Sequence, residues 1–293
     1  MSYFAFLAVF VGIPIALLSL WTIWDYQRGK WNPPALLAWR PWVVMLGLCV
    51  IAFVYTTPWD NYLVATGVWY YDPELVTGII FGWVPIEEYT FFIVLPIMTG
   101  LFSLVLMRYL PVNPVLAGGV NSNRLRTGVT LVMFVLWLIC TVILILSFVD
   151  SAWQYWRYFG LLMSWALIPV MIQTAFGADI FLRHWKVMLI GIVIPSIYLS
   201  WADSLAITAG TWTIAPEFSL AWLKIGGVLP MEEALFFTMV NVLVVTGMVL
   251  VLAEESQPRA IGYARYKLLR PIVEWLMGKD SVRQNLERVG AGD

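Results

Sequence analysis

Residues 59–92 read WDNYLVATGVWYYDPELVTGIIFGWVPIEEYTFF, and residues 201–237 read WADSLAITAGTWTIAPEFSLAWLKIGGVLPMEEALFF. The two stretches share residues in the same order, with one two-residue insertion in the second. The matched pairs are Asp60/Asp203, Gly67/Gly210, Trp69/Trp212, Pro73/Pro216, Glu74/Glu217, Pro85/Pro230, Glu87/Glu232, Glu88/Glu233, Phe91/Phe236 and Phe92/Phe237. Shared hydrophobicity alone does not explain this many ordered matches, so the chain contains an internal duplication.

The composition around this repeat is that of a membrane protein. Hydrophobic residues make up 61% of the chain and charged residues 12%, and an ordinary soluble domain carries roughly twice that charge. The net charge of −1, with no concentrated basic patch, argues against a nucleic-acid partner. A membrane-spanning helix needs about 20 apolar residues. Seven runs are long enough, at 3–24, 41–57, 84–107, 128–149, 157–177, 186–207 and 226–252.

These runs predict an all-α integral membrane protein made of two parallel three-helix repeats joined by a linker helix. The predicted parts are a first repeat at 1–127, a linker helix at 128–149, a second repeat at 150–253 and a charged tail at 254–293. Three crossings would invert the second repeat, and the linker restores its orientation, so both Glu pairs are expected at the same depth and on the same side. The apolar N-terminus lacks a basic leading region and a cleavage site, which predicts a retained helix and not a signal peptide.

Basic residues predict the orientation. Of the 17 Lys and Arg residues, all but Arg157 and Lys224 follow the first, third, fifth or seventh span. The positive-inside rule then places the C-terminus in the cytoplasm and the N-terminus outside, in the cell (inner) membrane. Asn61 and Thr211 are expected outside and Asn121 inside. The tail suits either a solvated segment or one that lies on the anionic cytoplasmic leaflet.

The two Pro-x-Glu-Glu motifs are the candidate catalytic groups, with Glu87 and Glu88 in one repeat and Glu232 and Glu233 in the other. Pro85 and Pro230 suit a helix start, which puts each Glu pair in a first turn. One interpretation is an interfacial acid stabilised by the helix dipole. Duplication of the motif, with no Lys or Arg in the apolar stretch of either helix, favours a functional site.

Acid catalysis on an apolar substrate is the chemistry that these motifs suggest. Burial away from cations favours the protonated carboxyl group, which is a proton donor. Neighbouring helix residues point about 100° apart, so one Glu of each pair is expected to face the site; which one is the acid stays open at this point. Orienting roles are predicted for Asp60, Asn61, Asp203 and Asn241.

Aromatic residues crowd the same blocks. An interfacial aromatic belt explains most of the 17 tryptophans. Rings beside the carboxyl groups would line the substrate and stabilise a cation. The candidates for that role are Trp59, Trp83, Phe91, Phe92, Trp201, Phe236 and Phe237.

Few residues suggest a metal or a cofactor. Cys49 and Cys140 lie in apolar runs and form no CxxC motif, and His184 sits in a basic connection that we expect to be solvated, so no metal site is predicted. No GxGxxG motif precedes a helix, so neither a flavin nor a nicotinamide cofactor is expected.

The PWD…GVW…PIEE and WAD…GTW…PMEE blocks resemble the lycopene cyclase domain family, membrane cyclases that occur as two small subunits in some bacteria and fused in others and in fungi. The resemblance covers residues 1–252, and seven spans match the fused form. It implies an intramolecular lyase or isomerase that converts the linear ends of lycopene to β-type rings through a carbocation, without net redox change, with the motif acids as catalysts. A departure from the pattern, Ser204 in place of Asn61, argues against equal contributions from the halves.

The partners implied are membrane lipid, the apolar carotenoid and other carotenoid-pathway enzymes. A carotenoid hydratase or a proton-coupled transporter could use the same buried glutamates. A retinal protein would need a lysine within 226–252, and an intramembrane protease would need further histidines and an arginine after the Glu pair. A magnesium-dependent prenyltransferase would need Asp-rich motifs on the cytoplasmic side.

Overall fold

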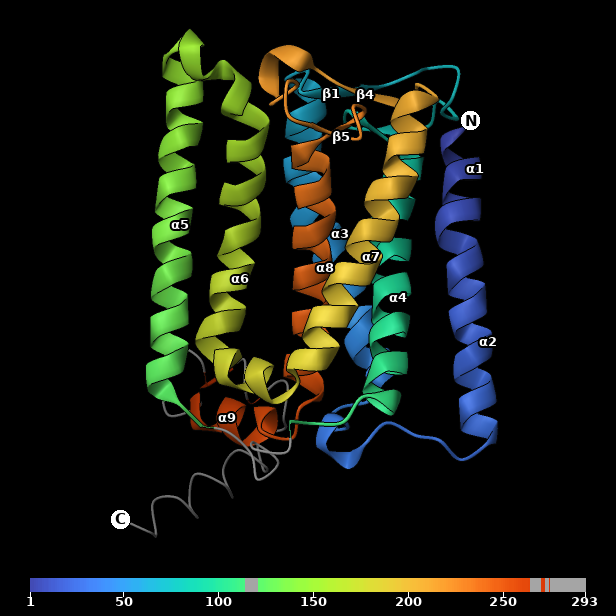
Figure 1. Cartoon of the computed structure of the whole chain (residues 1–293), viewed down its shortest axis with the longest axis vertical. Helices are drawn as coiled ribbons and strands as arrows, with labels where there is room; N and C mark the ends of the chain where they lie inside the picture. The colour runs from blue at the N-terminus through green and yellow to red at the C-terminus, as the bar shows by residue number, and fades with distance from the viewer. Residues whose placement is uncertain (114–120, 264–269, 272–273, 275–293) are drawn as a thin grey trace.

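The computed structural model describes residues 1–113, 121–263, 270, 271 and 274. Seven long apolar helices in this part of the chain are able to cross a membrane, and they run side by side (Figure 1). The first is continuous through α1 (Tyr3–Leu7), a π-helical turn η1 (Ala8–Gly12) and α2 (Ile13–Gln27); the others are α3 (Pro41–Ala65), α4 (Ile86–Tyr109), α5 (Asn123–Val149), α6 (Arg157–Arg183), α7 (Trp185–Thr208) and α8 (Met231–Leu252). The prediction of an all-α, multi-pass membrane protein is confirmed.

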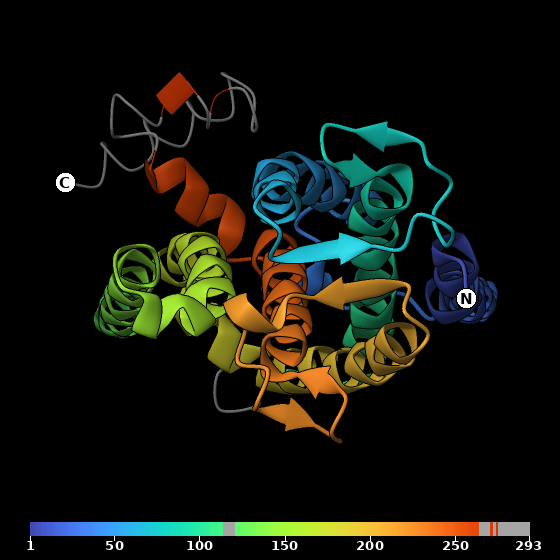
Figure 2. The same cartoon turned by 90° about the horizontal axis from the view of Figure 1, so that it is seen from above.

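Helices α4 and α8 lie at the centre of the bundle. They pack against each other, and each also packs against both α3 and α7 (Figure 2). Helix α5, the predicted linker, lies at the edge and packs along α6. The two helices that carry the Glu motifs are therefore neighbours in the interior, although the motifs are far apart in the sequence.

The second span is longer than predicted. It was expected to end at residue 57, but α3 continues through Pro58 to Ala65, so the Trp59-Asp60 segment is helical. The helix ends instead at Gly67, where φ is 72° and the amides of Gly67 and Val68 donate to the carbonyls of Val64 and Leu63. This is a Schellman ending, which favours glycine. The matched Gly210, with φ at 71°, ends α7 in the same way.

Short strands precede both motif helices. The structure pairs β2 (Ile80–Phe81) with β3 (Val84–Pro85), and β5 (Lys224–Ile225) with β6 (Leu229–Pro230). Because these residues form hairpins, the third and seventh helices start at Ile86 and Met231, later than the predicted 84 and 226. Each proline lies immediately before its helix, one position ahead of the predicted first turn.

A third pair of strands joins the repeats to each other. Strand β1 (Trp69–Tyr71) pairs antiparallel with β4 (Trp212–Ile214), and Tyr70 lies opposite Thr213. Those two residues occupy equivalent positions in the duplication, so the two strands pair about a local two-fold axis that passes between them. Strands β1 and β4 lie at the end of the bundle where α4 and α8 begin (Figure 1).

The opposite end of the bundle is held by buried ion pairs. Arg108 in the last turn of α4 binds Asp25 at 2.8 Å, and Asp179 binds both Arg126 at 3.2 Å and Arg259 at 2.8 Å. Arg259 belongs to α9 (Ser256–Tyr263), the only part of the predicted 254–293 tail that forms an extended described segment. The rest of that tail lies almost entirely outside the described residues.

His184 was expected in a solvated loop, and that expectation is wrong. It lies between α6 and α7 and is only 2% exposed, because the two helices are joined without a loop. Burial lowers the pKa of His184 to about 4, and the charge of Arg183 adds to this effect, so the imidazole is neutral at pH 7. In the part of the chain that the structure describes, the connections also include the 3₁₀ helices η2 (Pro34–Leu36), η4 (Ser151–Trp156) and η5 (Pro216–Phe218).

Candidate active site

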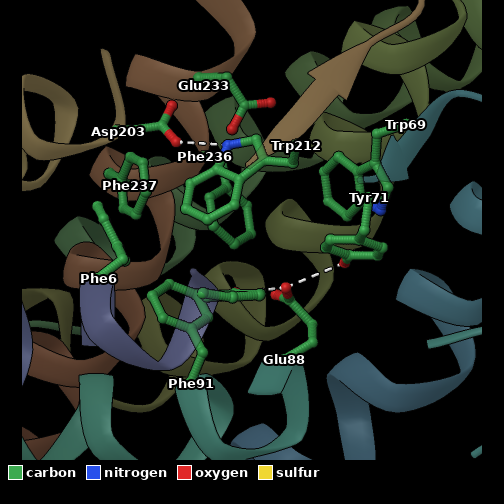
Figure 3. A pocket seen from close by; sticks show the side chains of 11 residues that line it. Phe6, Trp69, Tyr71, Glu88, Phe91, Asp203, Trp212, Glu233, Phe236 and Phe237 are labelled. Carbon is green, nitrogen blue, oxygen red and sulfur yellow. Dashed lines mark hydrogen bonds between the residues drawn. The ribbon is translucent and has the colours of Figure 1, made fainter. Parts of the chain in front are cut away.

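A cavity of about 40 Å³ lies where the two repeats meet, beside β1 and β4. Both repeats contribute to its wall (Figure 3). The lining residues are Tyr3, Phe6, Trp69, Tyr71, Glu88, Phe91, Asp203, Trp212, Glu233, Phe236 and Phe237. None of these eleven is a lysine, arginine or histidine, so the lining combines three carboxyl groups with aromatic rings.

Glu88 enters the cavity from the first turn of α4. Its Oε2 atom accepts two phenol hydrogen bonds, from Tyr3 at 2.5 Å and from Tyr71 at 3.0 Å. Tyr3 comes from the start of the first span and Tyr71 from β1. Three separate segments of the first repeat therefore fix the position of one carboxyl group.

Glu233 enters the same cavity from the first turn of α8. Its Oε1 atom accepts a hydrogen bond from the Tyr158 hydroxyl at 2.7 Å, and Tyr158 lies at the start of α6. Tyr3 and Tyr158 therefore have equivalent places, each at the beginning of its repeat and each bonded to the second Glu of the motif. Figure 3 shows Glu233 and Asp203 on one side of the aromatic rings and Glu88 on the other.

The first Glu of each motif has a different position. Glu87 accepts the backbone N–H of Thr77 at 2.6 Å, and Glu232 accepts the backbone N–H of Leu220 at 2.6 Å. Thr77 and Leu220 are equivalent positions of the loops that precede the hairpins. Glu87 and Glu232 thus hold these loops against the motif helices and do not line the cavity.

The two Asp residues break the symmetry of the repeats. Asp203 lines the cavity, and its Oδ1 atom accepts the indole N–H of Trp212 at 2.9 Å. Asp60 is fully buried but does not line the cavity, and neither of its oxygens bonds to a described residue. The N–H of Trp69, the counterpart of Trp212, has no acceptor among the described residues either.

Three of the predicted aromatic residues, Phe91, Phe236 and Phe237, line the cavity. Trp59 lies just behind them and stacks on Phe236 with ring centroids 6.0 Å apart. Phe92 is buried but packs edge-to-face on Tyr89.

Trp83 and Trp201 were also predicted to line the substrate, but the structure places them away from the cavity. Trp83 is 63% exposed and Trp201 is 53% exposed. Both side chains are on the surface of the bundle, where the interfacial aromatic belt accounts for them.

The two predicted asparagines contact other groups than the glutamates. Asn61 accepts the backbone N–H of Trp83 at 2.8 Å and donates to the hydroxyl of Tyr89 at 2.9 Å, which ties the β2–β3 turn to α3. Asn241 accepts from Thr99 at 2.7 Å and donates to Ser196 at 3.1 Å, deep between α4, α7 and α8. Neither side chain bonds to a motif Glu, so the geometry gives them packing roles.

Sequence reasoning missed the tyrosines. Tyr3, Tyr71 and Tyr158 are the hydrogen-bond donors to Glu88 and Glu233. A signal for two of them was present, because Tyr3-Phe4 and Tyr158-Phe159 start the two repeats and a leucine follows each tyrosine four residues later. Five-residue patterns in apolar runs are weak evidence on their own, and nothing in the sequence marked Tyr71.

Comparison with known proteins finds several relatives of this chain. The chain is 34% identical over 251 residues to a lycopene beta-cyclase of Halobacterium salinarum, a match that covers 85% of this chain and 95% of the relative. This chain belongs to the lycopene cyclase family. No protein-family model and no solved structure matches it.

Fungal members of the lycopene cyclase family are longer. A bifunctional lycopene cyclase/phytoene synthase of Phycomyces blakesleeanus is 34% identical over 205 residues, which is 68% of this chain and 32% of the relative. One from Blakeslea trispora is 35% identical over 193 residues, covering 64% of this chain and 30% of the relative. The family resemblance recognised in the sequence is confirmed.

Proposed function

We propose that this chain converts the linear ends of lycopene to β-type rings by proton-initiated cyclisation in the cavity shared by the repeats. The observation that carries the proposal is that Glu88 and Glu233, from equivalent motif positions, share one aromatic cavity whose described lining residues include no basic side chain. A carboxyl group in such a site can hold a proton and deliver it to an alkene. The relatives are named as lycopene cyclases, and we infer the carotenoid substrate from those names.

The reaction has three balanced steps. One carboxylic acid delivers its proton to the terminal double bond, which leaves a tertiary cation. The π electrons of the neighbouring double bond close a six-membered ring and move the positive charge into it. A carboxylate then removes a proton from a carbon next to the ring cation, and a new double bond forms. Substrate and product are isomers, so the proposed reaction involves no net oxidation or reduction.

The aromatic lining stabilises the cation between the first and third steps. Phe91, Phe236 and Phe237 present ring faces and edges around the cavity. A cation over an aromatic face gains about 0.5–2 kcal/mol, more where water is excluded. Exclusion of water also disfavours capture of the cation as an alcohol, which is the outcome that a hydratase would give.

Substrate access requires movement of the cavity wall. A volume of about 40 Å³ holds only a few water molecules, and a carotenoid end group is much larger. Tyr3 and Phe6 belong to the first span, of which only a small part is buried within the bundle. We infer that the part of the wall formed by Phe6 shifts outward when the carotenoid enters from the lipid, while Tyr3 stays bonded to Glu88.

Expression of the chain in cells that accumulate lycopene tests the proposal. We expect cyclic carotenoids, identified by chromatography and absorption spectra, because the chain supplies both the acid and the base. Cells that carry an empty vector are the control. Unchanged lycopene at normal protein levels would contradict the proposal, and hydroxylated lycopene would indicate a hydratase.

We also propose the orientation that the basic residues predict, with the N-terminus outside and the C-terminus in the cytoplasm of the cell membrane. Thr211 is fully buried and Asn61 half-buried, so exposed Glu74 and Glu217 are better label positions on the Glu-motif side, and exposed Asn121 serves the other side. A membrane-impermeant thiol reagent added to intact cells should label Glu74→Cys and Glu217→Cys but not Asn121→Cys. Labelling of Asn121→Cys alone would reverse the orientation.

A further inference from the structure

The two motif carboxyl groups that share the cavity have unequal hydrogen-bond donors. Glu88 accepts from two phenols, Tyr3 and Tyr71. Glu233 accepts from one phenol, Tyr158. The position equivalent to Tyr71 in the second repeat is Ile214, which carries no hydroxyl group. The duplication therefore provides Glu88 with one donor that Glu233 lacks.

Three carboxyl groups share this site, because Glu88, Asp203 and Glu233 line the same cavity of about 40 Å³. A fourth, Asp60, is fully buried in the adjoining helix α3. The described residues that line the cavity include no basic side chain to neutralise several charges. Like charges within a buried site disfavour one another, so ionisation of one carboxyl group keeps its neighbours protonated.

Hydrogen-bond donors determine which group carries that charge. Glu88 has two donors, Glu233 and Asp203 have one each, and Asp60 has none among the described residues. Donors to the charged form of a carboxyl group stabilise it. Burial raises the pKa of the Tyr71 hydroxyl well above its ordinary value of 10.0, and the nearby Asp60 and Glu88 raise it further, so Tyr71 stays a donor.

We propose that Glu233 is the acid that delivers the proton to the alkene, and that Glu88 is the base that removes a proton from the cyclised cation. This assignment rests on the proposed cyclase function. The Glu233 O–H bond breaks as the new C–H bond forms, and Glu88 gains the proton that the ring loses. Release of that proton from Glu88 to solvent and uptake of a proton from solvent by Glu233 restore the starting state without another co-reactant.

Under this assignment, the two repeats have different roles in the reaction. The ring type depends on which carbon loses its proton, so it is set by the position of the base. Glu88 and its two phenols, all in the first repeat, therefore determine product specificity. Glu233 in the second repeat determines the rate at which the cation forms. Tyr71 is a positioning residue, since it acts through Glu88.

Shortening each glutamate by one methylene group separates the two roles. In cells that accumulate lycopene, we expect Glu88→Asp to change the ring composition, with minor ring isomers rising at least several-fold, because the base is displaced from its carbon. Glu233→Asp should slow cyclisation and leave the ring composition unchanged. The readout is the ratio of β, γ and ε rings by chromatography, at protein levels matched to the wild type.

A second pair of variants, which remove only a hydroxyl group, tests the same roles in case the aspartate variants misfold. Tyr71→Phe removes a donor from Glu88, and Tyr158→Phe removes the donor from Glu233. We expect Tyr71→Phe to change the ring composition and Tyr158→Phe to change only the rate. A residue with a merely structural role would alter the amount of product and not the ratio of ring isomers.

The ring compositions of the two aspartate variants distinguish the possible assignments. A changed composition in Glu233→Asp alone would reverse the assignment, and a change in both or in neither aspartate variant would overturn the division of roles. Wild-type chain that makes no rings would instead overturn the proposed function, and this inference with it.

Discussion

Replacement of Glu88 or Glu233 by glutamine is expected to lower ring formation by about 10²- to 10⁴-fold, the usual contribution of general acid–base catalysis. Glutamine keeps the size of the side chain and an oxygen that can accept the tyrosine hydrogen bond, but it has no transferable proton and is a poor base. Both carboxyl groups line the cavity, and each is the only motif Glu of its repeat to do so. Loss of either should therefore stop the reaction at one of its proton transfers.

Glu87→Gln and Glu232→Gln are matched controls within the same motifs. Each glutamine keeps the oxygen that accepts the loop N–H of Thr77 or Leu220. We expect activity within about 10-fold of the wild type, the smaller loss typical of a residue that acts through its neighbours. Pigment analysis with quantified membrane protein checks all four variants. Wild-type activity in Glu88→Gln and Glu233→Gln, or inactivity confined to the two controls, would refute the choice of acids.

The number of helices and the motif region could be predicted because both depend on local sequence. Apolar runs report membrane spans directly, and the duplication marked both Glu pairs. The ends of the membrane spans were harder to predict. The second span was predicted at 41–57, yet α3 continues through Pro58 because a helix tolerates the loss of one hydrogen bond there, and the chain leaves the helix at Gly67.

The sequence did not show which glutamate of each motif faces the cavity, because this depends on contacts in the folded structure. Glu87 and Glu88 differ by about 100° in direction around α4, and only the contacts show that one faces a loop amide and the other two phenols. Those phenols come from segments distant in sequence. Asn241 was predicted to orient the glutamates, and in the structure it lies away from them and joins α4 to α7 through Thr99 and Ser196.

Solvent deuterium is expected at every ring that the chain forms. Membranes that contain the chain, supplied with preformed lycopene in D₂O, should yield cyclic product with one additional mass unit per ring, located on the carbon that was protonated. The acid delivers an exchangeable proton, whereas the proton that leaves comes from carbon. Glu88 and Glu233 lie in the first turns of α4 and α8, close to the surface loops and not in the middle of the spans, so exchange with solvent between turnovers is expected.

Mass spectrometry of the purified pigment, with fragmentation to locate the label, measures this incorporation. Cyclic carotenoid incubated in the same D₂O membranes is the control and should gain no mass, and lycopene incubated with the Glu233→Gln variant should stay both linear and unlabelled. Rings without deuterium would contradict delivery by an exchangeable carboxylic acid and would require the proton to come from carbon or from an acid that solvent does not reach. Deuterium in recovered lycopene but not in the rings would also contradict the assignment. It would mean that the acid protonates the terminal alkene reversibly, and that the cation which closes the ring receives its proton from another source.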